Sequence, residues 1–334
     1  MEDDKILMVH GNGGSATGEL IDKIFDKEFS NKTLDQMEDS AVVEGAGRIA
    51  MTTDSFVVTP AEFRGGDIGR LCVCGTVNDL LMRGATPKYL TCGFILEEGL
   101  SIDLLKRVVH SMAETAREAG VEIVAGDTKV VNGHGEIYIN TAGVGFVPDD
   151  VEISAGRAEV GDAIIVSGTM GDHHAAILSE RMEIETDIES DNAPLGDIVR
   201  NLLENKIKVH TLRDITRGGL GTVLKELSES AKKTFTIEDE LIPVSPKVRD
   251  FCGLLGLDPM YMGNEGKLVA FVAAEDEERA LEIIRNSKYG SGAVIIGHVT
   301  EDSDGRLIAR TAIGGERELD VLQGEGLPRI CSGL

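Results

Sequence analysis

The chain lacks tryptophan, and aromatic residues make up only 4% of its 334 residues. Aliphatic side chains are therefore expected to fill its cores. Proline is also scarce, at eight residues, and 42% of the residues are hydrophobic, which excludes a fibrous or disordered chain. The longest clean apolar run, Leu268 to Ala274, is far below the ~20 residues that cross a bilayer. The sequence thus predicts a globular protein with no membrane partner.

Cysteine is nearly as scarce, with five residues at positions 72, 74, 92, 252 and 331. Their number is odd and no two of them form a CxxC pair, so a disulfide framework is not expected. The acidic start Met1-Glu2-Asp3-Asp4 is unlike a secretory signal. Both observations predict a cytoplasmic protein, in which four of the five cysteines pack in the interior.

Positive charge is in deficit, because 33 lysine and arginine residues stand against 58 aspartate and glutamate residues, for a net charge of −25. Nucleic acid and anionic membranes are poor partners for such a chain. The length predicts two domains, each large enough for its own core. We expect a glycine-rich segment at 1–40, an N-terminal domain at 41–154, a C-terminal domain at 155–313 and a mobile tail at 314–334.

The apolar patterns predict an α+β protein, because helices and strands mix without the strict alternation of a doubly wound sheet. Residues 5–10 predict a strand, residues 17–29 a helix, and residues 41–44 and 48–58 a hairpin. Asp67 can cap a helix that reaches Gly84, and a second helix at 101–119 would end at Gly120.

The loop Gly11-Asn12-Gly13-Gly14-Ser15-Ala16 follows the predicted first strand and matches G-x-G-x-x-A. Its backbone N–H groups could hold a phosphate. A dinucleotide-binding fold would need a parallel βαβ unit here, whereas the next segments predict a hairpin. A plain turn is the simpler alternative, and a nicotinamide or flavin fold is the least favoured interpretation.

Four aspartates lie at the ends of apolar strands or in polar positions of apolar segments: Asp54, Asp79, Asp127 and Asp214. Each alone is equally well explained as a helix cap or Asx turn. Together they favour a site for nucleotide and Mg²⁺, since Mg²⁺ joins carboxylates to substrate phosphates. Lys129, two residues after Asp127, would share its strand face and could neutralise phosphate charge; the alternative is an exposed strand lysine.

Cys331 lies near the end of the chain in Leu327-Pro328-Arg329-Ile330-Cys331. An exposed thiol beside a cation is a candidate nucleophile or carrier group, against the alternative of an incidental terminal cysteine. Other motifs are expected to be structural: Cys72-Val73-Cys74 packs in a helix, and the acidic stretch from Glu180 to Asp191 is a solvated loop. His173 and His174 lack partners at the spacing of a transition-metal site.

Taken together, these segments resemble the superfamily of aminoimidazole ribonucleotide synthetase, selenophosphate synthetase and thiamine-monophosphate kinase, and within it the carbamoyl dehydratases of [NiFe]-hydrogenase maturation. The resemblance covers nearly the whole chain. It is carried by His10–Ser15, Thr52–Asp54, Gly75–Leu80 with Gly84-Ala85, Ala125–Val131, Arg213–Leu220, Gly263–Gly266 and the closing Pro328–Cys331. Family members usually end at this cysteine, whereas Ser332-Gly333-Leu334 follow it here.

The resemblance implies two PurM-like domains, each a mixed sheet packed by helices, and a homodimer whose N-terminal sheets form a barrel. It implies ATP and Mg²⁺ bound in a groove along that dimer by the N-terminal domain, with Asp54, Asp79 and Asp127 as candidate metal ligands. The other nucleotide contacts that it implies are Gly11, Asn12, Gly13, Gly14, Asn78, Thr128, Asp214, Thr216, Arg217, Gly218 and Gly219.

The implied reaction starts when a carbamoyltransferase of the HypF type loads a carbamoyl group onto Cys331. ATP then phosphorylates the carboxamide oxygen, phosphate leaves, and a thiocyanate remains, whose cyanide goes to iron on a HypC–HypD scaffold. Lys129 and Arg329 would assist with charge and Glu265 would act as base. The alternatives are a kinase or ligase of the same superfamily that acts on a free small molecule, and a maturation scaffold without catalysis.

Overall fold

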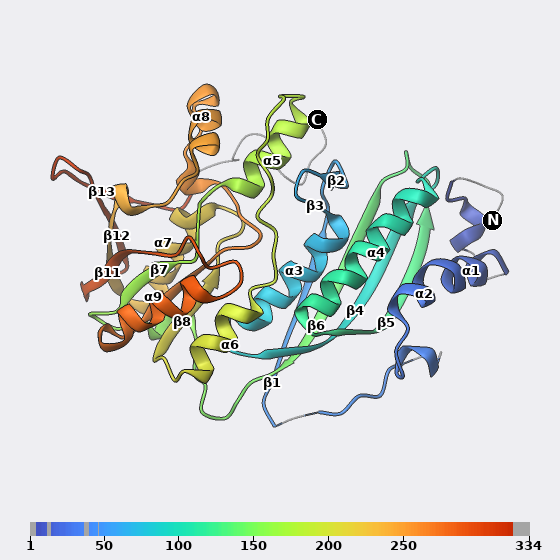
Figure 1. The fold of residues 1–334 in the computed structure, drawn as a ribbon, viewed down its shortest axis with the longest axis horizontal. Helices are drawn as coiled ribbons and strands as arrows, with labels where there is room; N and C mark the ends of the chain where they lie inside the picture. Colours follow the sequence, from blue (N-terminus) through green and yellow to red (C-terminus); the bar gives the residue numbers. More distant parts are fainter. Residues whose placement is uncertain (1–4, 12–14, 37–39, 46, 323–334) are drawn as a thin grey trace.

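The computed structural model describes residues 5–11, 15–36, 40–45 and 47–322. Figure 1 shows two parts, each a β-sheet with helices packed on it, joined by the segment after β6. No helix in these described ranges is long and apolar enough to cross a membrane.

The N-terminal part is a four-stranded sheet in the order β1-β6-β4-β5. β4 pairs with β6 in antiparallel fashion and with β5 in parallel, and β1 pairs with β6. Helices α3 and α4 lie together on one face of the sheet (Figure 1). The bounds are β1 Ile49–Phe56, β2 Glu62–Phe63, β3 Gly66–Asp67, α3 Ile68–Leu81, β4 Thr86–Glu97, α4 Ile102–Ala119, β5 Glu122–Val131 and β6 Ile137–Phe146.

Local sequence signals set the ends of these two helices. The Asp67 side chain accepts a hydrogen bond from the backbone N–H of Arg70 and so caps α3, as predicted. The Ser101 hydroxyl caps α4 in the same way, and α4 ends at Gly120, whose φ of 72° is in the left-handed region that glycine favours.

The C-terminal part is a seven-stranded sheet in the order β13-β12-β9-β11-β7-β10-β8, antiparallel except where β12 pairs with β9. Its strands are β7 Ala163–Val166, β8 Val209–Asp214, β9 Lys233–Glu238, β10 Leu268–Val272, β11 Val294–Asp302, β12 Arg306–Arg310 and β13 Glu316–Leu319. Its helices are α5 Asp172–Arg181, α6 Gly196–Glu204, α7 Gly219–Ala231, α8 Pro246–Leu255 and α9 Glu277–Asn286, with short 3₁₀ turns at Ala155–Arg157, Asp239–Leu241, Pro259–Tyr261 and Ala274–Asp276. The two mixed sheets confirm the predicted α+β class.

The first 60 residues differ from the prediction. The expected strand at 5–10 is a single bridge from Lys5 to Ser101, followed by a 3₁₀ turn at Met8–Gly11. The expected helix is present as α1 Ser15–Leu20, a π-helical turn Ile21–Phe25 and α2 Asp26–Phe29, with a 3₁₀ turn at Leu34–Gln36. The predicted hairpin is wrong, because β1 pairs with the distant β6.

The end of the chain also differs. The predicted tail begins at residue 314, but β13 (Glu316–Leu319) pairs with β12 and belongs to the sheet. Four of the cysteines, at 72, 74, 92 and 252, are buried free thiols, which confirms that they pack in the interior.

Candidate active site between the two parts

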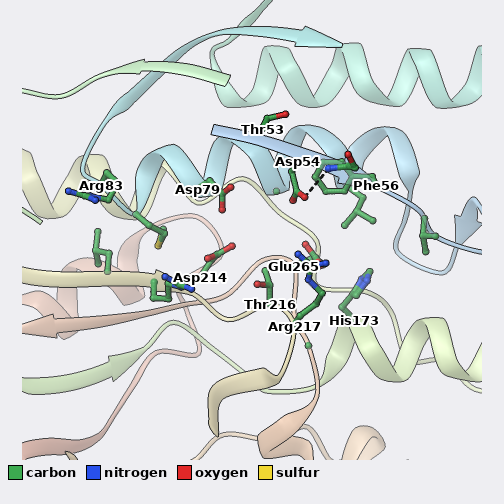
Figure 2. Close-up of a pocket in the computed structure, with 18 of the residues that line it drawn as sticks. Thr53, Asp54, Phe56, Asp79, Arg83, His173, Asp214, Thr216, Arg217 and Glu265 are labelled. Atoms are coloured by element: carbon green, nitrogen blue, oxygen red, sulfur yellow. Dashed lines mark hydrogen bonds between the residues drawn. The ribbon is translucent and has the colours of Figure 1, made fainter. Parts of the chain in front are cut away.

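A cleft of about 480 Å³ lies between the two parts of the chain. Figure 2 shows β1 and α3 on one wall and the end of β8, the turn after it and the loop around Glu265 on the other. The titratable side chains that line the cleft are Asp54, Asp79, Arg83, His173, Arg213, Asp214, Arg217 and Glu265. Residues that are 211 positions apart in sequence therefore share one site.

The N-terminal wall carries Asp54 and Asp79. Gly75 of α3 lets β1 approach closely, because a Cβ there would lie 2.7 Å from the Phe56 ring. The Thr52 hydroxyl donates to Asp79 Oδ2 at 2.8 Å. Burial raises the pKa of Asp79 above its usual range, and the charge of Asp54 raises it further.

The opposite wall carries Asp214 and Glu265. Asp214, at the end of β8, is 8% exposed, and its burial raises its pKa to about 7, with the charge of Asp79 adding to the effect. Desolvation raises the pKa of Glu265 well above its usual range, and the charges of Asp214 and Asp191 act in the same direction. Four carboxyl groups thus share the cleft with three arginines, and burial together with mutual repulsion disfavours the charged forms of Asp79, Asp214 and Glu265.

The turn after β8 presents Thr216 and Arg217 to the cleft. Gly218 and Gly219 have φ values of 83° and 66°, and a Cβ at Gly219 would lie 2.6 Å from the Met260 carbonyl oxygen. These two glycines therefore shape the turn. Helix α7 begins directly after it, so the N-terminus of a 13-residue helix follows Arg217 in the chain.

Asn78, a predicted nucleotide contact, does not line this cleft. Its side-chain amide donates to the Ala193 carbonyl at 3.0 Å and accepts from the Leu195 N–H at 2.9 Å. With both groups used and only 2% of the residue exposed, Asn78 fastens α3 to the segment before α6.

Asp127 and Lys129 lie on β5, at the opposite edge of the sheet from β1. Lys129 Nζ pairs with Asp127 Oδ1 at 2.7 Å, so the two residues share a strand face as predicted, and both are exposed. Three strand spacings separate β5 from β1, roughly 14 Å. One copy of the chain therefore brings Asp54 and Asp79 together but not Asp127.

The other residues predicted near the nucleotide also lie on the β5 side. Thr128 lines a smaller pocket of about 270 Å³ beneath Phe25 and Phe29. Gly11 packs against β5, where a Cβ would lie 2.8 Å from the Val130 nitrogen. Asn12, Gly13, Gly14, Arg329 and Cys331 lie outside the described residues.

The last described residues contact α7 and the 3₁₀ turn at Pro259–Tyr261. The Tyr261 hydroxyl donates to the Asp320 carbonyl at 3.0 Å, and the Leu322 N–H donates to the Thr222 hydroxyl at 3.2 Å. Thr222 is in the first turn of α7, the helix that follows Thr216 and Arg217. The last described residue is therefore held at the N-terminal end of α7.

Sequence reasoning missed the segment around Asp191. Asp191 was predicted to lie in a solvated loop, but its side chain is 5% exposed and pairs with Lys267 at 3.0 Å. Its other oxygen accepts from the backbone N–H of Glu265 at 3.0 Å. No local pattern marks this role, because both partners are more than 70 residues away.

In the described ranges no three aspartate, glutamate, histidine or cysteine side chains are close enough together to hold an ion. Mg²⁺ commonly takes only one or two carboxylates and completes its shell with phosphates and water. The Asp54 and Asp79 carboxylates fit that mode of binding.

Comparison with known proteins covers both parts of the chain. Residues 37–147 match the N-terminal domain of AIR synthase related proteins, and residues 159–310 match the C-terminal domain. Carbamoyl dehydratase HypE from Cupriavidus necator is 48% identical, with 98% of this chain and 95% of that protein covered.

Two crystal structures are similar over nearly the full length. HypE in complex with ATP gives a TM-score of 0.93 at 46% identity, covering 97% of this chain and 99% of that one. A HypE–HypF complex gives 0.80 at 45% identity, covering 91% and 99%. The chain therefore belongs to the HypE family of carbamoyl dehydratases, built from the two AIR synthase related domains.

Proposed function

We propose that this chain is an ATP-dependent carbamoyl dehydratase that converts an S-carboxamide on its own Cys331 into a thiocyanate for hydrogenase maturation. The observation that carries the proposal is the carboxylate-lined cleft, with the last described residue held against α7, the helix that follows Thr216 and Arg217 of that cleft. Its relatives named carbamoyl dehydratase and the ATP complex of a 46% identical HypE support it.

ATP is proposed to place its phosphates between the two walls of the cleft. Arg217 and the N-terminus of α7 offer positive charge from one wall. Asp54 and Asp79 would hold Mg²⁺ on the other. When bound, Mg²⁺ would neutralise phosphate charge.

The chemistry explains why such a cleft is needed. The carboxamide oxygen cannot leave as oxide, so its attack on the γ-phosphate of ATP turns it into a phosphate ester that can depart. Two protons must leave the nitrogen before S–C≡N forms. Glu265 is the proposed base for the first, since its carboxyl group lines the cleft on the wall opposite Asp54 and Asp79.

A homodimer is proposed to bring the β5 residues to this chemistry. The face of the N-terminal sheet opposite α3 and α4 carries exposed apolar side chains: Ile49, Met51, Ile95 and Val131. Two copies packed through this face would form the barrel and bury that surface. Lys129 and Asp127 are on the same face, where they would meet the dimer groove.

The tail is proposed to carry Cys331 to the cleft. Cys331 lies nine positions after Leu322, and nine residue steps span at most about 30 Å. Arg329, two residues before the thiol, is proposed to stabilise the thiolate or a phosphate. Because the thiol must stay reduced to be loaded, a cytoplasmic setting is proposed.

The partners are proposed from the same chemistry. A carbamoyltransferase of the HypF type would load Cys331, in keeping with the solved HypE–HypF complex of a relative. A HypC–HypD complex would accept the cyanide.

Intact-mass measurement tests the proposal. Incubation with the carbamoyltransferase and carbamoyl phosphate should add one carbamoyl group to Cys331, and ATP should then remove the mass of one water. Cys331→Ala should show neither change. Dehydration that persists in Cys331→Ala would refute it, and ADP formation from a free small molecule by a chain lacking residues 323–334 would favour the kinase alternative.

A further inference from the structure

We propose that His173 is the second proton acceptor of the dehydration, taking the last N–H proton and passing it to the departing phosphate. This inference rests on the proposed function. Its starting point is chemical, because one nitrogen must lose two protons and a single carboxylate can hold only one at a time.

His173 is in the first turn of α5 and lines the same cleft as Glu265 (Figure 2). That turn is bonded to the loop that carries Glu265. The N–H of His174 donates to the Gly263 carbonyl at 3.1 Å, and the N–H of Gly171 donates to Asn264 Oδ1 at 2.8 Å. The imidazole and the carboxylate are therefore held on one rigid wall.

The protein fixes the orientation of this imidazole. His173 Nδ1 lies 2.8 Å from the Ser190 hydroxyl, and the ring meets Phe63 edge-on at 5.6 Å between centroids. The Ser190 hydroxyl also accepts from the Asn192 N–H at 3.2 Å and has a second lone pair for Nδ1–H. With the proton on Nδ1, Nε2 carries a free lone pair.

Burial favours the neutral form of the His173 imidazole. It is 1% exposed, and burial lowers its pKa to about 4; the nearby Arg181 and His174 act in the same direction and Asp191 opposes them. A neutral imidazole can take a proton, and once charged in this setting it gives the proton up readily.

The step balances. The N–H bond breaks and its proton goes to Nε2, the nitrogen electron pair forms the C≡N bond, and the C–O bond breaks to release phosphate. The imidazolium then returns its proton to the phosphate, which leaves as hydrogen phosphate. Summed with the first proton, the reaction gives thiocyanate, ADP, hydrogen phosphate and one proton.

The test compares His173→Asn with His174→Asn in the full-length chain. Asparagine at 173 can keep the hydrogen bond to Ser190 but has no group at the position of Nε2. His174 is adjacent and buried but does not line the cleft, so it is the matched control. Each variant is carbamoylated, mixed with ATP, and followed for ADP and for loss of water from Cys331.

His173→Asn should carbamoylate normally, bind ATP within about twofold of wild type, and form thiocyanate about 10²-fold more slowly, with more ADP released than thiocyanate formed. His174→Asn should match wild type. Thiocyanate formation by His173→Asn within about threefold of wild type, or an equal fall in ADP and thiocyanate, would overturn the assignment.

If His173→Asn loses ATP binding, His173→Gln replaces it and is judged by the same outcomes. Failure of the wild-type chain to lose water would instead refute the proposed function.

Discussion

Asp214 in the cleft and Asp127 on β5 both belong to glycine-containing acidic motifs, yet the fold gives them opposite surroundings. Asp214 is buried near two other carboxylates, and its pKa rises to about 7. Asp127 is exposed and paired with Lys129, which lowers its pKa. The cleft therefore holds carboxyl groups whose charged forms burial disfavours and a cation would stabilise, whereas the charge of Asp127 is already compensated by Lys129.

The largest expected effect is at Asp79. Asp79→Asn should reduce ATP-dependent dehydration by at least about 10²-fold, because a proposed Mg²⁺ ligand is lost. The same variant should raise the melting temperature of the nucleotide-free protein, since repulsion with Asp54 and Asp214 is removed while Thr52 keeps a partner. Asp127→Asn is the control and should give no such rise. A lower melting temperature for Asp79→Asn would contradict the cleft as a site of charge repulsion.

Dimers that combine two different variants test whether Lys129 on β5 acts on the cleft of its own chain or on that of the other copy. Lys129→Ala and Cys331→Ala should each be inactive alone. If Lys129 acts on the cleft of the other copy, co-refolded or co-expressed mixtures should form up to about a quarter of the wild-type amount of thiocyanate. With random pairing, about half of the dimers are mixed, and each mixed dimer has one active cleft of two. The same yield as the unmixed variants would mean that Lys129 acts on its own chain.

The pH dependence of stability distinguishes the cleft from the β5 edge, because the fold raises the pKa of Asp214 and lowers that of Asp127. A carboxyl group whose folded pKa is raised from near 4 to about 7 stabilises the fold most at low pH, and this advantage is lost as pH rises through 7. The nucleotide-free protein should therefore melt at lower temperature at pH 8 than at pH 6. Asp214→Asn should flatten this slope, and Asp127→Asn should leave it unchanged; an unchanged slope in Asp214→Asn would show that Asp214 is not the group responsible.

The smallest expected effect is on the ion pair at the β5 edge. Asp127→Ala should change the free energy of unfolding by less than about 1 kcal/mol, because exposed ion pairs contribute little. Chemical denaturation measures it. A loss several times larger would mean that the isolated chain already depends on a covered β5 face, and that denaturation reports on the dimer.

What the sequence predicted correctly was encoded locally. Asp67 marks the start of α3 and Gly120 the end of α4 through contacts within a few residues. Asp127 and Lys129 share a face because side chains two residues apart in a strand point the same way. The aspartates of the cleft were found because their motifs are short and distinctive, although nothing in the chain indicated which of them would meet.

The sequence-based predictions that differ from the structure share one cause: the residues concerned contact partners that are far away in the sequence. β1 pairs with β6 and not with residues 41–44, the segment that precedes it in the chain. Asn78 is adjacent to Asp79 in the sequence, but its side-chain amide bonds residues more than 110 positions away. The sequence around Asp191 predicts a solvated acidic loop, whereas in the fold Asp191 is bonded to Lys267 and to the backbone N–H of Glu265. Burial of this kind is decided by tertiary packing and leaves no periodic signal.

The anchorage of the chain at Asp320 and Leu322 has a kinetic consequence. A thiol tethered nine residues beyond a fixed point meets its own cleft at an effective concentration on the order of millimolar, independent of how dilute the protein is. Enzyme and substrate are then one molecule. The proposed dehydration would follow first-order kinetics, its yield would be limited to one thiocyanate per loaded chain, and its reactive phosphorylated intermediate would remain attached to the molecule that made it.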